Sequence, residues 1–536
     1  MTVSAILLCG CSKKEEPVKQ VHRSISLRLV HGPEIQALIK SLKQDFLSRG
    51  PVLQDGQKVE LELISSLGTV AAKGIASGSI KTDGWLASSR SLVNYTNMNL
   101  SNLGPQQVEC KQLFATPVII ATQKRNRYFF NAVGDEFSWK EFFDARIDQT
   151  QAETKQPLNI SFAHGSPLSS TSGLASLLQL TYLATFGEKR VLDSDLLRNK
   201  TTLSRLKHYE EQVSNYGVSE SFFLDKVVNS SPDRVAFALT TEHQLALFNA
   251  AISEPSKRLI ALYPKEGSYW EDYNLCMSDS DWTGPAARAA LRMWTDYLSS
   301  DEAQFKIKQH GLRPSVVNIG EVAPLDQNHG VNTSLPSASY LPAPGDVTSF
   351  LLESWGKIQR PVAMQIVLDT SGSMEKNLLV GQDYLRNWLA ASSQRDLKSL
   401  MSFSSEVRID TEFTDDSVAV IKALDQTRAL GGSSLYEGIK QALSRLSEKE
   451  LAPYRKALLL FTDGEDLNSQ ISLEYLSDLV RQKSALYDIH LMIIAVKKEG
   501  ASHSDLQRLA KAANGVFVQG DLLEMNTIFS EMFKNI

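Results

Sequence analysis

The sequence is poor in cysteine, in clustered positive charge and in long apolar runs. It has four cysteines among 536 residues, and Cys110 and Cys276 lie far apart, without the C-x-x-C spacing of a zinc site. The formal charge is only −5 and no long Lys/Arg run occurs, which argues against nucleic acid as a partner. Beyond the N-terminus, no segment approaches the roughly 20 apolar residues of a membrane-spanning helix.

The sequence also lacks recognisable motifs of catalytic sites. No Ser/His/Asp or Cys/His set has a recognisable spacing, and His164 is a lone histidine that we expect in a loop. No G-x-x-x-x-G-K loop for nucleotide phosphates occurs. We therefore expect a binding protein and not an enzyme.

The composition is that of a globular protein with several domains. Hydrophobic residues make up 42 % of the chain and charged residues 22 %. At roughly 100–200 residues per domain, the length predicts about three domains, each large enough to bury a core of its own.

The first residues resemble the signal of a bacterial lipoprotein. Val3 to Leu8 is a short apolar run that leads into Leu8-Cys9-Gly10-Cys11, with an aliphatic residue three positions before Cys11 and a small residue just before it. This is similar to a lipobox, and it implies that Cys11 carries lipid and that residues 1–22 are signal and tether. The protein would then be a lipoprotein of the cell envelope, periplasmic or on the cell surface, anchored to a membrane by lipid.

Two features depart from that pattern. No Lys or Arg precedes the apolar run, and the run is shorter than the usual ~7–15 residues. A start codon assigned too late explains both features. The alternative is an apolar tip without a targeting role.

Residues 23–323 alternate short apolar runs with amphipathic segments. Ile25–Val30 and Val59–Ile64 are predicted strands, with a helix from Glu34 to Leu47 between them. This order of strand, helix and strand predicts a parallel sheet with helices on both faces, in which ligands bind at the carboxyl ends of the strands.

Several segments follow the order found in bacterial extracellular solute-binding proteins, also called periplasmic binding proteins. They are Ala87-Ser88-Ser89, Phe114–Ala121, Ser169–Leu174, Thr240–His243, Leu262–Gly267 and Gln304–Pro314. The resemblance implies an α/β domain of two lobes with a ligand cleft between them.

In that family the solute is captured by helix N-termini, whose unpaired N–H groups and dipole favour anions. The resemblance implies ligand-binding roles for Ser170, Thr171 and Ser172, and for Ser65, Ser66 and Ser88 on the opposite wall. Ser and Thr before a helix are also common N-caps, so these residues can be purely structural. The cleft would then be a rigid platform for the last domain.

Cys110 and Cys276 are the only candidate disulfide pair if the chain is exported. By the same resemblance, Cys110 precedes the strand that crosses into the second lobe, and Cys276 lies near the return crossover. Both would be close to the hinge. Two buried free thiols are the alternative.

Residues 324–346 are predicted to be a connector. They carry four prolines, Pro324, Pro336, Pro342 and Pro344, and little apolar periodicity. A short amphipathic helix from Val347 to Lys357 is expected to lead into the last domain and to place Trp355 in the core there.

Residues 347–536 predict a doubly wound, Rossmann-like α/β domain. Val362–Leu368 and Lys456–Phe461 are apolar runs typical of strands buried on both faces. The first run is followed by D-T-S-G-S and the second by T-D-G, while a G-G-S loop opens a helix between them. Since the carboxyl ends of parallel strands meet at one edge, we expect these loops to converge there.

This order of loops resembles the von Willebrand factor A domain with its metal-ion-dependent adhesion site. The resemblance implies a divalent cation held by Asp369, Ser371, Ser373, Ser433 and Asp463. Hydroxyl and carboxylate oxygens suit a hard cation, Mg²⁺ first, with Ca²⁺ or Mn²⁺ as alternatives. In the family the two aspartates act mainly through water, and an open coordination position accepts a carboxylate from a protein partner. Ser433 stands where the family usually has Thr, which keeps the oxygen and loses a methyl group.

Two functions follow from these patterns. The first is a lipid-anchored extracytoplasmic binding protein that contacts a protein or surface through the metal, with the solute-binding-like lobes as platform or sensor. The alternative is the substrate-binding receptor of a transport system, with a small solute in the cleft and the last domain as an accessory.

Overall fold

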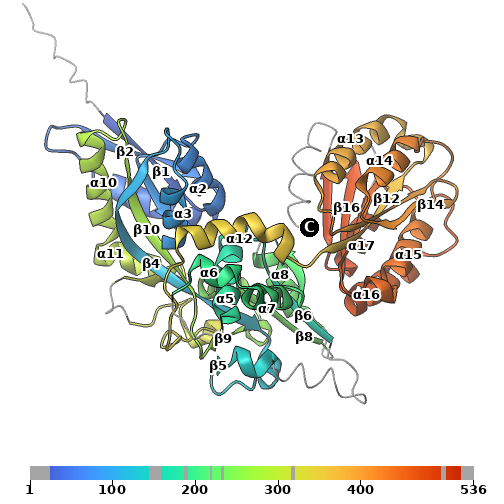
Figure 1. Ribbon diagram of the computed structural model, residues 1–536, viewed down its shortest axis with the longest axis horizontal. Helices are drawn as coiled ribbons and strands as arrows, with labels where there is room; N and C mark the ends of the chain where they lie inside the picture. The colour runs from blue at the N-terminus through green and yellow to red at the C-terminus, as the bar shows by residue number, and fades with distance from the viewer. Residues whose placement is uncertain are drawn as a thin grey trace, which may run out of the picture.

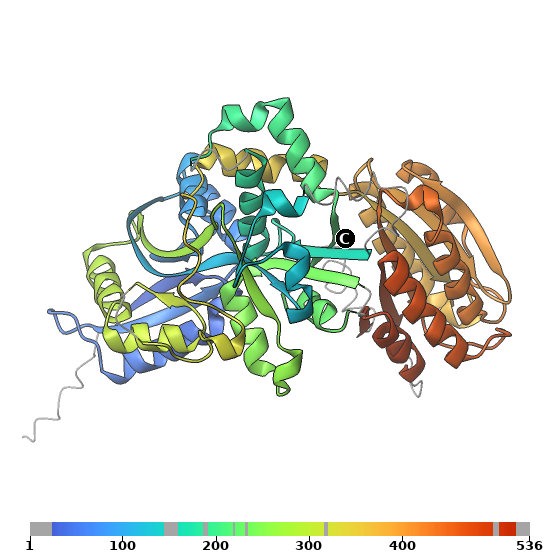
Figure 2. The same cartoon turned by 90° about the horizontal axis from the view of Figure 1, so that it is seen from below.

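The computed structural model describes residues 24–143, 159–185, 191–217, 220–230, 234–315, 320–496 and 503–520. Figure 1 shows two bodies, an N-terminal part at the left and a C-terminal α/β domain at the right. Figure 2 shows the same division from below. The predicted α/β architecture is confirmed. The predicted lipidation site, Cys11, lies outside the described residues.

The N-terminal part is built on one sheet with the strand order β2-β1-β3-β10-β4-β8-β6-β7. Its strands are β1 (Ser24–His31), β2 (Lys58–Ser65), β3 (Gly84–Ala87), β4 (Gln106–Thr122), β6 (Asn159–Gly165), β7 (Val213–Gly217), β8 (Arg234–Thr241), β9 (Ile260–Pro264) and β10 (Trp270–Asp279), with the short β5 (Glu136–Phe137) and β11 (Arg313–Pro314) beside them. Strand β1 pairs in parallel with β2 and β3, as the alternating pattern predicts.

Strand β4 divides this part into two lobes. Its first half pairs with β10, and its second half pairs with β8 and β9. The first lobe surrounds β1–β3 and the second surrounds β6–β8. Their helices are α1 (Gln36–Ser48), α2 (Gly68–Ser77), α3 (Arg90–Met98), α5 (Thr171–Ala184), α6 (Ser194–Arg198), α7 (Lys200–Glu210), α8 (Glu220–Val228), α9 (Glu242–Ala251), α10 (Pro285–Leu298) and α11 (Asp301–Gln309), with the 3-10 turns η1 (Pro33–Ile35) and η2 (Lys124–Phe130).

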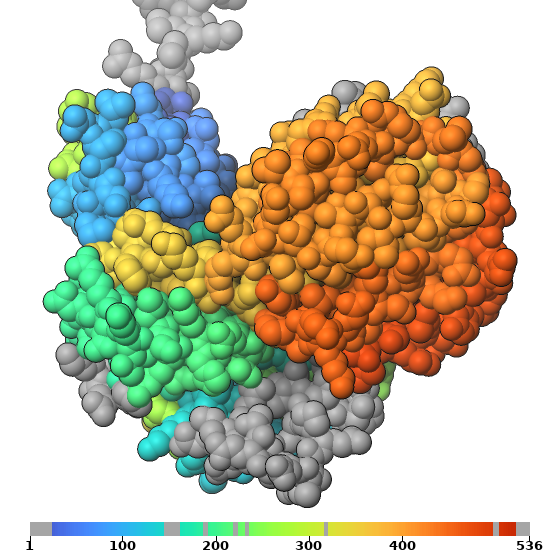
Figure 3. All heavy atoms as spheres, turned by 45° about the vertical axis from the view of Figure 1, so that its right-hand side comes forward, coloured from blue at the N-terminus to red at the C-terminus, as the bar shows by residue number. Residues whose placement is uncertain are grey.

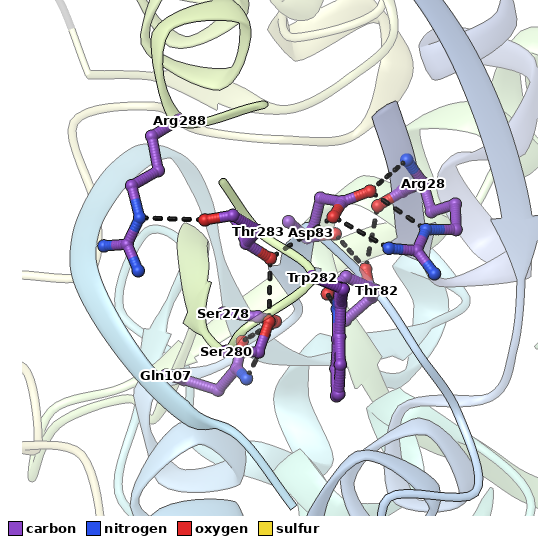
Figure 4. A network of polar contacts seen from close by, with 10 residues as sticks. Arg28, Thr82, Asp83, Gln107, Ser278, Ser280, Trp282, Thr283 and Arg288 are labelled. Atoms are coloured by element: carbon purple, nitrogen blue, oxygen red, sulfur yellow. Dashed lines mark hydrogen bonds and ion pairs between the residues drawn. The ribbon is translucent and has the colours of Figure 1, made fainter. Parts of the chain in front are cut away.

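A polar network lies in the first lobe at the amino end of β3 (Figure 4). Arg28 of β1 binds Asp83 through two nitrogens, Nη2 to Oδ1 at 2.9 Å and Nε to Oδ2 at 3.0 Å. Thr283 donates to the same carboxylate at 3.2 Å, and the Trp282 indole donates to the Thr82 carbonyl at 3.0 Å. These contacts join β1, β3 and the segment after β10. The Asp83 side chain is only 3 % exposed, so water competes little with them.

A disulfide joins Cys110 of β4 to Cys276 of β10. The two strands are antiparallel neighbours, and the cysteines lie where their register shifts. The bond therefore ties together the first lobe's half of the crossing strand and its return strand, closing a separation of 166 residues.

The connector and the helix after it pack on both lobes, which differs from the expected arrangement. Tyr340 stacks on Tyr182 of the second lobe with ring centroids 4.3 Å apart, while the Ala343 N–H donates to Ser91 of the first lobe at 2.6 Å. Helix α12 (Gly345–Ile358) then lies across the lobes, visible as the yellow surface between the blue and green regions in Figure 3.

Trp355 accordingly belongs to the core of the lobes and not to that of the last domain. Its ring lies 5.1 Å from that of Tyr216 in β7. The apolar face of α12 is evident in the sequence, but the surface that it meets is set by distant segments. The C-terminal domain therefore begins after α12, near Arg360.

The C-terminal domain has a doubly wound sheet in the order β14-β13-β12-β15-β16-β17. Its strands are β12 (Val362–Asp369), β13 (Leu397–Phe403), β14 (Val407–Thr414), β15 (Arg455–Thr462), β16 (Ile489–Val496) and β17 (Val516–Gly520). Its helices are α13 (Glu375–Ala391), α14 (Ser417–Gln426), α15 (Leu435–Leu446), α16 (Leu473–Tyr487) and α17 (Ser504–Ala512). Apart from the antiparallel edge strand β14, all pairings are parallel. The sequence also predicts a last helix after the strand near Val516, and that segment lies outside the described residues.

Apolar clusters cover both faces of this sheet, as expected for strands buried on both sides. Among the described helices of the whole chain, none is both long and apolar enough to cross a membrane.

Candidate functional site

The loops that the sequence predicts to hold a metal converge at one edge of the C-terminal sheet. Residues 369–374 follow β12, and residues 462–468 follow its parallel neighbour β15. Residues 430–434 lead into α15, which packs over β12 and β15. We call these three loops the metal edge. Because β12 and β15 are central strands whose connections run to opposite sides, their carboxyl ends form the crevice at which doubly wound sheets bind ligands.

Asp369 is the buried centre of the metal edge. It is fully buried, and its Oδ1 accepts the N–H of Ser371 at 2.9 Å. Its Oδ2 accepts the hydroxyl of Thr462 at 2.6 Å. The hydroxyls of Ser371 and Ser373 lie 3.1 Å apart, so the two residues present neighbouring oxygens, one buried and one exposed.

Ser433 connects the second and third loops. Its N–H donates to Asn468 Oδ1 at 3.0 Å, and its carbonyl accepts the N–H of Asn468 at 2.8 Å. Its hydroxyl donates to the carbonyl of Glu465, which leaves an oxygen lone pair for a cation. The first loop is tied to the second by the Gly372 N–H, which donates to the Gly431 carbonyl at 3.0 Å.

The electrostatics of the metal edge suit a cation. Burial, with a smaller contribution from the negative charge of Asp463, raises the pKa of Asp369 to about 6; Asp463 is itself only 1 % exposed. Two buried carboxyl groups with hydroxyls beside them form an oxygen donor set of the kind that hard divalent cations prefer. In the described part of the chain, this edge included, no group of three or more His, Cys, Asp and Glu side chains could hold a metal ion, so hydroxyl oxygens make up much of the donor set here.

Asp466 has a structural role at the same edge. Its Oδ1 accepts the N–H of Tyr436 at 3.3 Å and the hydroxyl of Ser469 at 2.6 Å. It therefore binds the first turn of α15 and fixes the third loop against that helix.

Comparison with known proteins assigns this domain. Residues 364–465 match the family model of the von Willebrand factor type A domain. The C-terminal domain is a von Willebrand factor type A domain. The matched residues include all five predicted metal ligands.

Solved structures resemble the two parts of the chain separately. BatB of Bacteroides thetaiotaomicron, titled a conserved hypothetical protein, is 18 % identical and covers 32 % of this chain and 98 % of its own, with a TM-score of 0.27. The periplasmic binding protein AfuA of Actinobacillus pleuropneumoniae is 12 % identical over 62 % of this chain and 99 % of its own, with a TM-score of 0.42. The Trichodesmium protein IdiA (FutA), solved with iron and citrate, is 12 % identical over 61 % and 96 %, with a TM-score of 0.40. No curated protein matches the sequence significantly.

The A domain contacts the lobes through the opposite edge of its sheet. Arg360, just before β12, donates from its N–H to the hydroxyl of Tyr216 at 3.2 Å. The guanidinium of Arg455, at the start of β15, lies 4.6 Å from the centre of the Tyr216 ring. Lys226 of α8 lies 3.4 Å from His490, near the start of β16. Because these contacts use the amino ends of the strands, the metal edge at the carboxyl ends faces away from the lobes.

The sequence suggested that His164 lies in a loop. The structure places it instead in strand β6, next to this interface. It is the penultimate residue of β6, is fully buried, and its Nε2 lies 3.1 Å from Glu210 Oε2. The hydroxyl of Tyr216 donates to the same Glu210 oxygen at 2.7 Å. Burial, and then the charge of Glu210, raise the pKa of Tyr216 well above its ordinary value. The cluster is buried inside the second lobe and supports the surface on which the A domain rests.

The cleft between the lobes contains a cavity of about 250 Å³. It is lined by Pro33, Glu34, Leu67, Ser169, Ser170, Thr171, Ser172, Gln244 and Glu271. Three of the predicted ligand residues, Ser170, Thr171 and Ser172, are therefore on its wall. The lobes touch beside it, since the hydroxyl of Thr69 donates to the Leu168 carbonyl at 3.1 Å.

The other predicted cleft residues are not on the wall. Ser65 is the last residue of β2 and Ser66 follows it; both stay outside the cavity, and Ser65 is exposed. Ser88 is buried behind it, 3.2 Å from the point that a β-carbon on Gly68 would occupy. Glu34 and Glu271 could not be found from sequence patterns, because a carboxylate becomes a cleft residue only through the packing of the two lobes.

A larger pocket of about 600 Å³ lies at the interface between the second lobe and the A domain. Its charged lining residues include Arg481 and Arg508, which pair with surface carboxylates of their own domain. Its position, far from the metal edge and the cleft, makes it part of the domain interface.

Proposed function

We propose that this protein is an extracytoplasmic binding protein, anchored by lipid at Cys11, that binds a protein partner through a divalent cation on its A domain. The cation, Mg²⁺ in the first place, is held by Asp369, Ser371, Ser373, Ser433 and Asp463. Its remaining coordination position takes a carboxylate of the partner. The role is binding and not catalysis, with the two lobes as the platform that carries the A domain.

The main support for this proposal is the convergence of the three loops. The three loops of the metal edge bring Asp369, Ser371 and Asp463 together, each at most 3 % exposed, and hydrogen bonds join the loops to one another. A rigid set of oxygen donors at a strand-end crevice is the arrangement that binding of a hard cation requires. The site also faces away from the lobes, so a large partner can reach it.

Calorimetric titration of the full chain with Mg²⁺ tests the proposal. The wild type should bind the ion, Asp369→Ala should not, and Asp478→Ala, at an exposed position of α16, should bind as the wild type does. A wild type that binds neither Mg²⁺, Ca²⁺ nor Mn²⁺ contradicts the proposal. Capture from membrane extract, with and without EDTA, then asks whether a partner depends on the ion.

Solute capture in the cleft is a second candidate function, as in the receptor of a transport system. The cavity at the N-terminus of α5 favours it, because Ser169 and Thr171 line that cavity with hydroxyls that have no hydrogen-bond partner among the described residues. A buried hydroxyl without a partner costs about 1–3 kcal/mol, which a bound ligand would recover. Release of a small molecule from the denatured protein, detected by mass spectrometry, supports this function.

A further inference from the structure

The cleft cavity has two walls of opposite polarity. We propose that it binds a small zwitterion of the amino-acid type, with the ligand's carboxylate at the N-termini of α5 and α2 and its ammonium group at Glu34 and Glu271. This inference rests on the second candidate function, solute capture in the cleft, and names the chemical class of that solute.

The first wall presents hydrogen-bond donors. Helix α5 has Ser170 as its N-cap, whose hydroxyl accepts the Gly173 N–H at 3.1 Å. Ser169 and Thr171 flank this cap, are 9 % and 8 % exposed, and have hydroxyls without a partner in the described structure. The N-terminus of a helix of this length attracts negative charge through its dipole and its orphan N–H groups.

A second helix N-terminus reinforces this wall. Helix α2 begins after Leu67, which lines the cavity and provides no side-chain cap. Its first residue is Gly68, where an added β-carbon would lie 3.5 Å from the Thr171 hydroxyl and 3.2 Å from that of Ser88. Gly68 therefore brings the start of α2, in the first lobe, next to the Thr171 hydroxyl at the start of α5. A carboxylate there would receive donors from both lobes.

The second wall presents two carboxylates. Glu34 lies in the turn η1, and Glu271 lies in β10 and is 3 % exposed. The hydroxyl of Tyr273 lies 3.2 Å from Glu34 Oε1 and 3.1 Å from Glu271 Oε2. Burial, then the charges of Glu271 and Glu34, raise the pKa of Tyr273 well above its ordinary range.

This geometry suits a cationic donor group. The hydroxyl of Tyr273 lies within hydrogen-bond distance of both carboxylates, so two negative groups lie close to each other at this wall. An ammonium group has a positive charge and three donors, and it would relieve the repulsion between the two acids. Gly32 permits the arrangement, because a β-carbon at that position would collide with the Glu34 carboxylate.

The residues that line the cavity, and its volume, disfavour the other common solutes. An inorganic phosphate or a simple carboxylate has no positive group to set against Glu34 and Glu271, and the described lining contains no Lys or Arg. The described lining also contains no aromatic side chain on which a sugar ring can stack. At about 250 Å³ the cavity is smaller than the roughly 300–1,000 Å³ of pockets for drug-sized ligands, so a compact ligand fits best.

The experiment measures binding to the full chain in EDTA, so that the metal edge does not contribute. After exhaustive dialysis, thermal unfolding and calorimetry are recorded with each common amino acid. Each one that binds is compared with its analogue lacking the amino group and its analogue lacking the carboxylate, such as propionate and ethylamine for alanine. Inorganic phosphate and glucose complete the panel. We expect at least one amino acid to bind, and both of its analogues to bind roughly 10- to 100-fold more weakly, because each loses charged hydrogen bonds.

Two pairs of variants locate the site. Glu271→Gln and Thr171→Val should each weaken amino-acid binding roughly 10-fold or more. Their matched controls, Glu62→Gln on β2 and Thr201→Val in the first turn of α7, are at exposed positions and should leave binding unchanged. If Glu271→Gln fails to fold, Glu34→Gln, at a half-buried position, tests the same wall.

The outcomes separate this inference from the functions on which it depends. Binding of phosphate or glucose, or binding of the analogue without an amino group as tightly as the amino acid, would overturn the zwitterion assignment and leave solute capture intact. No binding by any member of the panel would overturn the assignment and remove the support for solute capture. In neither case would the binding of Mg²⁺ to the A domain be affected.

Discussion

Thr462 at the end of β15 donates its hydroxyl to Oδ2 of Asp369 at the end of the neighbouring strand β12, at 2.6 Å. The same hydroxyl accepts the N–H of Gly464 at 2.9 Å. Thr462 therefore fixes the orientation of the buried carboxylate and the start of the third loop together. It positions the metal edge without being one of the five predicted ligands.

Thr462→Val should weaken Mg²⁺ binding by roughly 10- to 100-fold, because groups that orient a metal ligand affect affinity on that scale. Valine keeps the shape of threonine, so the domain should stay folded. Calorimetry measures the effect, and Thr411→Val in the edge strand β14 is the control. Equal affinity in wild type and Thr462→Val would show that Thr462 does not position Asp369 for the ion.

Asp83→Ala should destabilise the first lobe by about 3 kcal/mol, near the lower end for breaking a buried ion pair, because Arg28 retains some solvent contact. Chemical denaturation followed by tryptophan fluorescence measures the loss. Asp425→Ala removes an exposed pair with Arg386 and should cost less than about 1 kcal/mol. Similar losses in the two variants would contradict the structural role of the network in Figure 4.

Trp355→Ala should lower the stability of the lobes by about 3–5 kcal/mol, because it leaves a cavity between α12 and the second lobe. The A domain follows α12 directly, so its position relative to the lobes should also become less defined. Thermal unfolding reports the first effect and small-angle X-ray scattering the second. Phe305→Ala, at an exposed site on α11, is the control. Unchanged scattering would mean that the contacts of Arg360 and Arg455 alone hold the A domain in place.

His243→Gln should reduce the sensitivity of the protein to acid. Burial lowers the pKa of His243 from its ordinary value of 6.5 to about 4. The unfolded chain therefore takes up a proton between about pH 6.5 and 4 that the folded chain excludes. This contribution to stability is complete above pH 6.5 and is lost as the pH falls toward 4, by at most about 3 kcal/mol.

Melting temperatures of wild type and His243→Gln across this range measure the difference. The wild type should lose more stability on acidification than the variant, which retains the acid response of the buried His31 and His490, whose pKa values burial also lowers. His208→Gln, at an exposed position of α7, controls for the substitution itself. Parallel curves for wild type and His243→Gln would contradict the prediction.

The convergence of the three loops at one sheet edge was predictable because its signals are local. Asp369, Ser371 and Ser373 follow a continuous apolar strand, and Asp463 follows another. The rule that parallel strands end at one edge is enough to bring such loops together. The role of Thr462 was not predictable, because a threonine before an aspartate carries no sign of the carboxylate on the next strand.

The cleft was predictable only in part. Ser170 to Ser172 precede an apolar helix, and that pattern is visible in the chain. Glu34 and Glu271 are 237 positions apart, and they meet at Tyr273 only because β10 returns from the second lobe to the first. The sequence therefore predicted an anion site, while the cavity has a negative wall as well.

The sequence by itself determined the α/β class, the alternation of strands and helices, and the set of oxygen donors at the end of β12 and β15. These follow from short-range periodicity and from the geometry of parallel sheets. Only the tertiary structure decided that α12 and Trp355 belong to the lobes, that Glu34 and Glu271 line the cleft, and that the metal edge faces away from the rest of the chain. Each of these depends on which surfaces bury one another, a choice made by the packing free energy of the whole chain that no local segment encodes.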